Sequence, residues 1–271
     1  MNPQTSTPAE AIFANLEDLV ADLENLYRDV HSHPELSMQE TRTAGLAADR
    51  LEAAGYEVTR AVGKTGVVGI LRNGDGPTVM LRADMDALPV KEATGLPYAS
   101  TVVGTASEGK STPVMHACGH DMHVTWLVGA ATLLARHRDL WKGTLMPVFQ
   151  PGEETAQGAQ AMIDDDMLKR FPKPDVILGQ HVMPLPAGVI ASRDGVVTSA
   201  GDSLQIRLFG RGAHGSMPQA SVDPVVMSAA TVLRLQTIVS REVAPTDAAV
   251  VSIGALQAGT KENVIPDDAT I

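Results

Sequence analysis

Residues 144–154 are Thr-Leu-Met-Pro-Val-Phe-Gln-Pro-Gly-Glu-Glu, an apolar run that ends in a turn and two carboxylates. Three more short apolar runs, at 67–71, 78–81 and 176–178, are bounded by Gly, Pro or Asp. Such runs are typical of buried strands. A helical apolar pattern at 124–134 lies between two of them. The sequence therefore predicts an α/β domain with a mainly parallel sheet and flanking helices.

Two helices are predicted before the first of these strands. Apolar residues from Leu16 to Val30 recur at steps of three and four, which predicts one long helix ending near His31. Ser37 followed by Glu40 forms a capping-box pair, which predicts a second helix that stops at Gly55. An extended stretch is expected from Tyr56 onward.

A domain boundary is predicted in the Pro-rich stretch 183–188, because its prolines can neither continue a helix nor join a central strand. The expected domains are 1–186, which carries the metal-binding residues, and 187–271. The second, smaller α+β domain should contain strands at 203–209 and 249–255, a helix from Asp223 and Pro224 to about Arg241, and an extended segment from Val264.

Composition and charge exclude several classes of partner. The chain has 271 residues, 44% of them hydrophobic, and a formal charge of −11 that would repel nucleic acid and anionic membranes. It has one cysteine, no basic and apolar leader, and no uncharged apolar run near the ~20 residues of a membrane span. A cytoplasmic protein without a nucleic-acid or membrane partner is expected.

Four polar clusters stand out, and three of them directly follow predicted strands: 82–86, 116–123, 150–154 and 180–181. Ligands bind outside the carboxyl ends of strands in open parallel sheets, so these clusters should meet there. Zinc or manganese accepts thiolate, imidazole and carboxylate donors, which Cys118, His120, Glu154 and His181 supply. A lone cysteine is usually a small buried hydrophobe, but two histidines within five residues favour the metal site.

The paired carboxylates indicate divided roles. Glu153 and Glu154 cannot both point at one ion in the same way, so one can coordinate while the other takes a proton from a water whose pKa the metal lowers. Asp84 and Asp86 lie two residues apart after a strand, and one of them is expected to orient a ligand imidazole. A helix cap or turn is an equal alternative for Asp84.

The stretch 210–215, Gly-Arg-Gly-Ala-His-Gly, matches the dinucleotide-binding pattern after a strand. That interpretation is rejected, because Met217 and Pro218 stand where the phosphate-binding helix should run and the expected acidic residue is absent. A Gly-rich turn that presents His214 is the alternative, although a single loop histidine is usually only exposed.

The ordered motifs resemble those of the aminoacylase and hippurate hydrolase family of two-metal amidohydrolases, the branch that includes plant auxin (IAA)-conjugate hydrolases. The matching strings are His31-Ser-His-Pro-Glu35, Arg82-Ala-Asp-Met-Asp-Ala-Leu-Pro89, Met115-His-Ala-Cys-Gly-His-Asp121, Gln150-Pro-Gly-Glu-Glu154, His214-Gly-Ser216 and Asn263-Val-Ile-Pro266. They span nearly the whole chain. The Cys-Gly-His-Asp and Pro-Gly-Glu-Glu strings are highly specific.

The resemblance implies a zinc-peptidase-like catalytic domain that holds two divalent metal ions, Zn or Mn. Cys118 would bridge them, and His120, Glu154 and His181 would be the other ligands. Glu153 would be the general base toward a metal-activated water, and Asp86 would orient a ligand. The implied activity is hydrolysis of the amide bond of N-acyl amino acids. Asp84 stands where sister branches have a ligand histidine.

The resemblance also implies a dimerisation role for 187–271 and a homo-oligomer, either a dimer or a tetramer. His214 would reach the partner's site to stabilise an oxyanion, and Asn263 would lie near the substrate carboxylate. Family members continue well beyond the position of Ile271, so we expect a last ligand histidine and the closing catalytic strands to lie outside this chain. A catalytically inactive fragment or homologue that serves in binding or dimerisation is the alternative.

Overall fold

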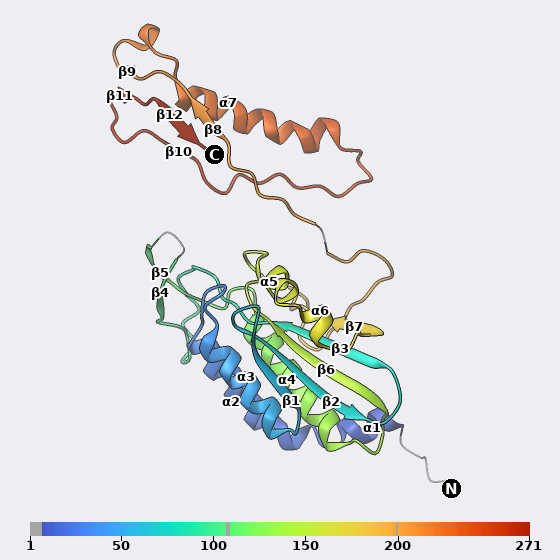
Figure 1. Cartoon of the computed structure of the whole chain (residues 1–271). Coiled ribbons are helices and arrows are strands. Elements are labelled where there is room, and N and C mark those ends of the chain that lie inside the picture. Colours follow the sequence, from blue (N-terminus) through green and yellow to red (C-terminus); the bar gives the residue numbers. More distant parts are fainter. Residues whose placement is uncertain (1–6, 107–108, 199) are drawn as a thin grey trace. The chain divides into compact units, whose positions relative to one another are not determined.

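The structure, a computed structural model, describes residues 7–106, 109–198 and 200–271. It divides into two compact units, Met1–Ala187 and Gly188–Ile271 (Figure 1). The division lies one residue after the boundary predicted at 186/187, whereas the catalytic and dimerisation roles of the two parts stay predictions.

The first unit is built on a five-stranded sheet in the order β1-β2-β6-β3-β7. The strands are β1 (Glu57–Val62), β2 (Gly66–Asn73), β3 (Thr78–Asp84), β6 (Gly143–Gln150) and β7 (Val176–Gly179). β6, β3 and β7 pair in parallel, and β2 pairs antiparallel with both β1 and β6. Four of the five strands therefore point the same way, which confirms the α/β class. β2 is reversed because the three residues between β1 and β2 are too few for a parallel crossover.

Alternate side chains of the sheet face two separate hydrophobic clusters, as the two-residue period of a strand requires. In β6, Leu145 and Phe149 belong to one cluster, and Met146 and Val148 belong to the other. The central strands β2 and β6 are therefore buried on both faces, which is why they appear in the sequence as continuous apolar runs. The edge strand β7 is exposed.

Helices cover both faces of this sheet (Figure 1). Apolar residues of α2 (Glu17–Ser32), α3 (Thr41–Ala53) and α4 (His120–Arg136) pack on one face. Residues of the shorter α5 (Gly158–Asp164) and α6 (Met167–Arg170) pack on the other. The unit also contains α1 (Pro8–Phe13) and the hairpin of β4 (Val103–Thr105) with β5 (Ser111–Pro113). The predicted helices at 16–31 and 124–134 are confirmed.

The predicted capping box of α3 is wrong. Ser37 Oγ donates to Asp86 Oδ2 at 2.6 Å instead of capping the helix. The carboxylate of Glu35 accepts from the backbone N–H groups of Arg42 and Thr43 at 2.9 and 2.8 Å, and it thereby caps α3. Glu40 is fully buried and accepts from Gly152 N at 2.7 Å. Both side chains of the predicted pair therefore bond to residues distant in the sequence instead of to the first turn of α3.

The second unit contains two small antiparallel sheets, β10-β12-β8 and β11-β9, and one long helix. The elements are β8 (Arg207–Phe209), β9 (Ala213–His214), η1 (Pro218–Ala220), α7 (Pro224–Thr237), η2 (Ile238–Glu242), β10 (Gln257–Ala258), β11 (Val264–Ile265) and β12 (Asp268–Thr270). Asp223 caps α7 by accepting from Val225 N at 2.8 Å, so the predicted start of this helix is confirmed.

Two details of the second unit differ from prediction. The strand predicted at 249–255 is wrong, since that segment is extended but unpaired, with Val250 86% exposed, and β10 begins only at Gln257. The strand predicted at 203–209 is shortened to β8.

The Gly-rich stretch 210–215 is followed by the three-residue η1 rather than a long helix, in agreement with the rejection of a dinucleotide site. Among the described residues, no helix combines the length and apolar character that a membrane span requires.

Candidate metal centre

The fold brings the predicted polar clusters to one edge of the five-stranded sheet. Asp84 is the last residue of β3, Gln150 is the last residue of β6, and the two are register partners in a parallel pair. His181 follows two residues after β7, and His120 is the first residue of α4. The carboxyl ends of three adjacent parallel strands therefore meet the N-terminus of a helix.

Two glycines allow the loops at this edge to approach closely. Gly119 precedes α4 with a φ of +81°, and a Cβ there would lie 2.4 Å from Val182 Cγ2. A Cβ on Gly158, the first residue of α5, would lie 1.5 Å from the carbonyl oxygen of Pro151. The first contact sets the turn before α4 against the segment after β7, and the second packs the loop 151–154 against α5.

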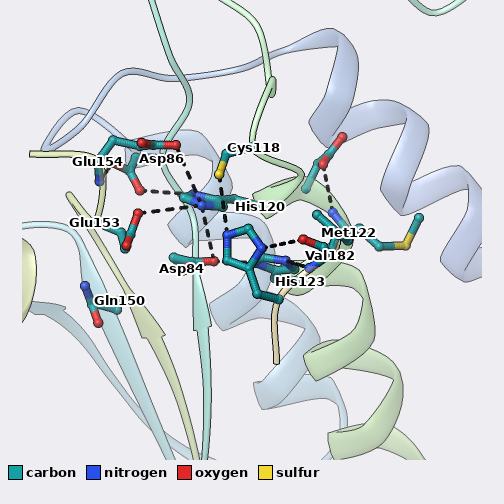
Figure 2. Close-up of polar contacts among 12 residues, drawn as sticks. Asp84, Asp86, Cys118, His120, Met122, His123, Gln150, Glu153, Glu154 and Val182 are labelled. Carbon is teal, nitrogen blue, oxygen red and sulfur yellow. Dashed lines mark hydrogen bonds and ion pairs between the residues drawn. The ribbon is translucent and has the colours of Figure 1, made fainter. Parts of the chain in front are cut away.

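His120 lies at the centre of the cluster, fully buried (Figure 2). Its Nε2 atom is 3.8 Å from three carboxylate oxygens, those of Asp84 (Oδ1), Glu153 (Oε2) and Glu154 (Oε1). Beside it, Cys118 Sγ lies 3.4 Å from His181 Nε2. The imidazole of His120 therefore faces a thiol on one side and carboxylates on the other.

Asp86 orients this imidazole from behind. Its Oδ1 atom is 3.3 Å from His120 Nδ1, which leaves Nε2 directed toward the carboxylates. Its Oδ2 atom accepts from Ser37 Oγ at 2.6 Å and from Glu154 N at 2.9 Å. A carboxylate that fixes the far nitrogen of an imidazole is the usual support of a ligand histidine.

Three overlapping groups of side chains place their donor atoms within 4.8 Å of one another. They are Cys118, His120 and His181; His120, Glu153 and Glu154; and Asp84, His120 and His123. All three share His120. The first two together contain every ligand predicted from the sequence.

The donor atoms fit a divalent cation, because several of them are buried without a hydrogen bond. Within the described residues, His120 Nε2 and Glu154 Oε1 have no hydrogen-bond partner, and His120 Nδ1 has only the ion pair with Asp86 at 3.3 Å. Buried polar atoms are normally paired, and leaving one unpaired costs about 1–3 kcal/mol. A bound cation would satisfy His120 Nε2 and Glu154 Oε1 together.

The electrostatics of the site also call for positive charge. Burial, together with the carboxylates of Glu154 and Glu153, raises the pKa of the Cys118 thiol to about 12. Burial likewise raises the pKa of Glu154. Burial would lower the pKa of His120, but the neighbouring carboxylates of Asp86 and Asp84 outweigh it and raise that pKa. A cation would favour the thiolate of Cys118 and release its proton.

Burial acts on Asp84 too, yet the outcome is the opposite. Burial would raise its pKa, but the hydrogen bond from His123 and the charges of His120 and Arg82 outweigh this and lower the pKa to about 2. The helix-cap alternative for Asp84 is wrong, because the residue ends β3 and accepts from His123 and Arg82 at 2.5 and 2.7 Å.

The two site residues predicted in the second unit lie side by side there. His214 in β9 is exposed, and it is paired with Val264, the residue after Asn263. The carbonyl of Asn263 accepts from Gly215 N at 2.8 Å, and His214 Nδ1 lies 2.8 Å from Ser216 Oγ. The structure thus brings His214 and Asn263 together within their own unit.

Sequence reasoning missed two residues around the centre, Ser37 and His123. His123 stands three residues after His120, a spacing that places both side chains on one face of a helix and could have revealed it. The local pattern around Ser37 indicated a helix cap instead, and its contact with Asp86 spans 49 positions of the chain, so no local signal could have revealed it.

A site of this composition, at the carboxyl edge of an α/β sheet, defines a candidate metal centre, and comparison with known proteins gives its family. Residues 80–264 match peptidase family M20/M25/M40, so the chain belongs to this family. It is 44% identical over 256 residues to the hippurate hydrolase of Campylobacter jejuni, a match that covers 94% of this chain and 64% of that protein.

Two other proteins from Bacillus subtilis are also similar. One is an N-acetyl-L-cysteine deacetylase, 38% identical over 259 residues, a match that covers 95% of this chain and 59% of that protein. The other is a solved structure described as a dinuclear metal-binding peptidase of the M20 family. It is 36% identical with a TM-score of 0.65, and the match covers 94% of this chain and 63% of that one. The chain thus spans less than two thirds of the length of each protein.

Proposed function

We propose that this chain carries most of the active site of a metal-dependent amidohydrolase that cleaves the amide bond of N-acyl amino acids. One observation carries the proposal: two groups of donors, Cys118–His120–His181 and His120–Glu153–Glu154, share His120, and within each group the donor atoms lie within 4.8 Å of one another. The hippurate hydrolase and the N-acetyl-L-cysteine deacetylase among its relatives support the substrate class.

The proposed ligands are Cys118, His120, Glu154 and His181, which would together hold the two ions that the resemblance implies. Mixed S, N and O donors suit zinc or manganese. When bound, such ions polarise a substrate carbonyl and lower the pKa of water toward neutrality. Asp86 would keep His120 Nε2 directed at the ions, since it lies 3.3 Å from the other ring nitrogen.

Glu153 is the proposed general base. Its side chain is 39% exposed, against 18% for Glu154, so it is the member of the pair that water and substrate reach more readily. Its carboxylate would take the proton of the attacking water and deliver it to the leaving nitrogen. Glu154, the more buried member, would coordinate.

For the second unit we propose the roles that the resemblance implies. His214 would stabilise the oxyanion of the tetrahedral intermediate in a partner's site, and Asn263 would contact the substrate carboxylate. The role of His214 requires a homo-oligomer. Exposed apolar side chains in this unit, including Phe209 and Leu233 at 70% and 71% exposure, are compatible with an interface. Light scattering of the protein in solution would measure the oligomeric state.

The substitution Glu153→Gln tests the proposal. We expect turnover of N-acetyl and N-benzoyl amino acids to fall by roughly 10²–10⁴-fold, the usual contribution of a general acid–base group, while the metal content stays unchanged. The measurements are steady-state hydrolysis with Zn²⁺ or Mn²⁺ and elemental analysis of the purified protein.

The control is Glu57→Gln, the same change at an exposed position of β1, which should leave both readouts unaltered. Retained turnover in Glu153→Gln would show that Glu153 is not the general base. A protein that binds no stoichiometric transition metal would overturn the proposal and favour a binding or dimerisation protein. If the proposal holds, hydrolysis of a substrate series from N-acetyl to long-chain acyl amino acids would define the preferred acyl group.

A further inference from the structure

A second histidine of α4, His123, lies directly beneath the candidate metal centre and has no role in the proposed chemistry. It is 1% exposed. Its ring centroid is 4.6 Å from that of His181 and 5.3 Å from that of His120, so it contacts both proposed ligand imidazoles. Figure 2 shows His123 between Asp84 and Val182.

The hydrogen bonds of His123 fix the position of its proton. The backbone N–H of Val182 donates to His123 Nε2 at 2.9 Å. An amide N–H can only donate, so Nε2 must be unprotonated and the proton must lie on Nδ1. From there it is donated to Asp84 Oδ1 at 2.5 Å. Both nitrogens are therefore occupied. His123 cannot ligate a metal in this arrangement, although it forms a donor group with Asp84 and His120.

The backbone of Val182 also contacts His181, through its carbonyl. His181 Nδ1 lies 2.6 Å from the carbonyl oxygen of Val182 and donates to it, which leaves Nε2 facing Cys118 Sγ at 3.4 Å. The backbone of Val182 is thus held by His123 at its N–H, and its C=O orients His181. The side chain of Val182 is confined as well, because it packs against Gly119 where no Cβ would fit.

The Asp84 end of this chain of hydrogen bonds is anchored in the sheet. Arg82 Nη1 donates to Asp84 Oδ2 at 2.7 Å, and Arg82 Nε donates to Gln150 Oε1 at 3.0 Å. The network therefore runs from the end of β6 through β3 and α4 to the segment after β7. It connects the helix that carries His120 to the segment that carries His181.

We propose that His123 is a positioning residue, which holds His181 in its ligating orientation through the backbone of Val182 while Asp84 keeps the proton of His123 on Nδ1. This inference rests on the proposed function, because it takes His181 as a metal ligand. Residues that support a ligand in this way typically change metal affinity by about 10–100-fold when they are replaced.

Two substitutions separate the two ends of the imidazole. In His123→Asn, the amide can replace Nδ1 as the donor to Asp84, but it does not reach Val182. In His123→Gln, the longer side chain can place its carbonyl oxygen near the position of Nε2 and accept from Val182 N. We therefore expect His123→Asn to lower the affinity for Zn²⁺ by about 10–100-fold. His123→Gln should stay within about threefold of the wild type.

The readouts are Zn²⁺ titration calorimetry and hydrogen exchange of the Val182 amide. Exchange at Val182 should accelerate in His123→Asn and stay slow in His123→Gln. Thr132→Val is the control, since the hydroxyl of Thr132 bonds only within α4, to the carbonyl of Val128. It should change neither readout. Equal affinity in the Asn and Gln variants, or unchanged Val182 exchange in the Asn variant, would overturn the proposal.

A third measurement needs neither a variant nor a metal. The ¹⁵N shifts of the His123 ring in the wild-type protein should report the tautomer with the proton on Nδ1. A proton on Nε2 would overturn the proposal, because Nε2 could then not accept from Val182 N. If the wild type binds no Zn²⁺, the metal-centre proposal fails by itself. The ring tautomer and the exchange of the Val182 amide would then still decide whether His123 binds the backbone N–H of Val182.

Discussion

At the scale of single residues, a buried histidine outside the metal centre shows how charge supports this fold. His31 Nδ1 lies 2.6 Å from Asp121 Oδ2, and its Nε2 lies 3.1 Å from Glu92 Oε1. The hydrogen bond with Asp121 is the largest cause that raises the pKa of His31. Asp121 Oδ1 in turn accepts from Met122 N, so the charged His31 tethers the first turn of α4.

This arrangement predicts a stability that depends on pH. Because the folded pKa of His31 is raised above its unfolded value of about 6.5, its contribution is complete below that pH and is lost as the pH rises through the folded pKa. We expect His31→Gln to lower the free energy of unfolding by roughly 1–3 kcal/mol near pH 6, the range for hydrogen bonds to charged groups. The loss should shrink in alkaline solution.

Urea unfolding of both proteins over a pH series would measure this difference. His33→Gln is the matched control, because the side chain of His33 is 52% exposed and should contribute little. A deficit in His31→Gln that is independent of pH would argue that His31 acts by packing rather than by charge.

At the scale of elements, the contact between the loop 151–154 and α5 controls where Glu153 and Glu154 lie. Gly158 N donates to Gly152 O at 3.1 Å. A Cβ on Gly158 would overlap the Pro151 carbonyl. Backbone meets backbone here, so no side-chain rotation can relieve the overlap.

We therefore expect Gly158→Ala to displace this loop, to lower the free energy of unfolding by about 1–3 kcal/mol as other overpacked sites do, and to weaken Zn²⁺ binding. Gly45→Ala in α3 is the control, because a Cβ there meets no atom within 4 Å. It should raise stability by roughly 0.5–1 kcal/mol through lower backbone entropy in the unfolded chain. Denaturant unfolding and Zn²⁺ titration would check both, and equal behaviour of the two variants would contradict the prediction.

At the scale of the whole molecule, the division into two units predicts which residues metal binding protects from amide hydrogen exchange. The three groups of candidate metal donors all lie within Met1–Ala187. A ligand stabilises the structure that it binds by mass action. We expect added Zn²⁺ to slow amide hydrogen exchange at 84–86, 118–123, 150–154 and 180–182, and to leave 188–271 unchanged.

Hydrogen exchange followed by mass spectrometry, with Zn²⁺ and with a chelator, would test this distribution. Mg²⁺ at the same concentration is the control for nonspecific binding to an acidic protein, since it prefers oxygen ligands and gains little from a thiolate. Equal protection in both units, or protection by Mg²⁺ alone, would contradict the assignment of the centre to the first unit.

The sequence by itself determined the elements of the first unit and the residue types of the centre. Strands buried on both faces must be continuous apolar runs, so β2, β3 and β6 were predictable from local pattern. The apolar run at 176–178 also forms a strand, β7, although it lies exposed at the edge of the sheet. The meeting of the polar residues that follow these strands was also predictable, because the carboxyl ends of parallel strands lie at one edge of a sheet. Local pattern failed at 249–255, where the apolar residues find no partner strand.

Only the tertiary structure decided which side chains meet. Ser37 bonds Asp86 rather than capping α3, and His123 joins Asp84 to Val182 across 39 and 59 positions of the chain. The reversal of β2 likewise follows from a short hairpin rather than from its apolar pattern. The physical reason is that the energy of a buried polar group depends on the partner the fold brings to it, and spacing along the chain does not encode that partner.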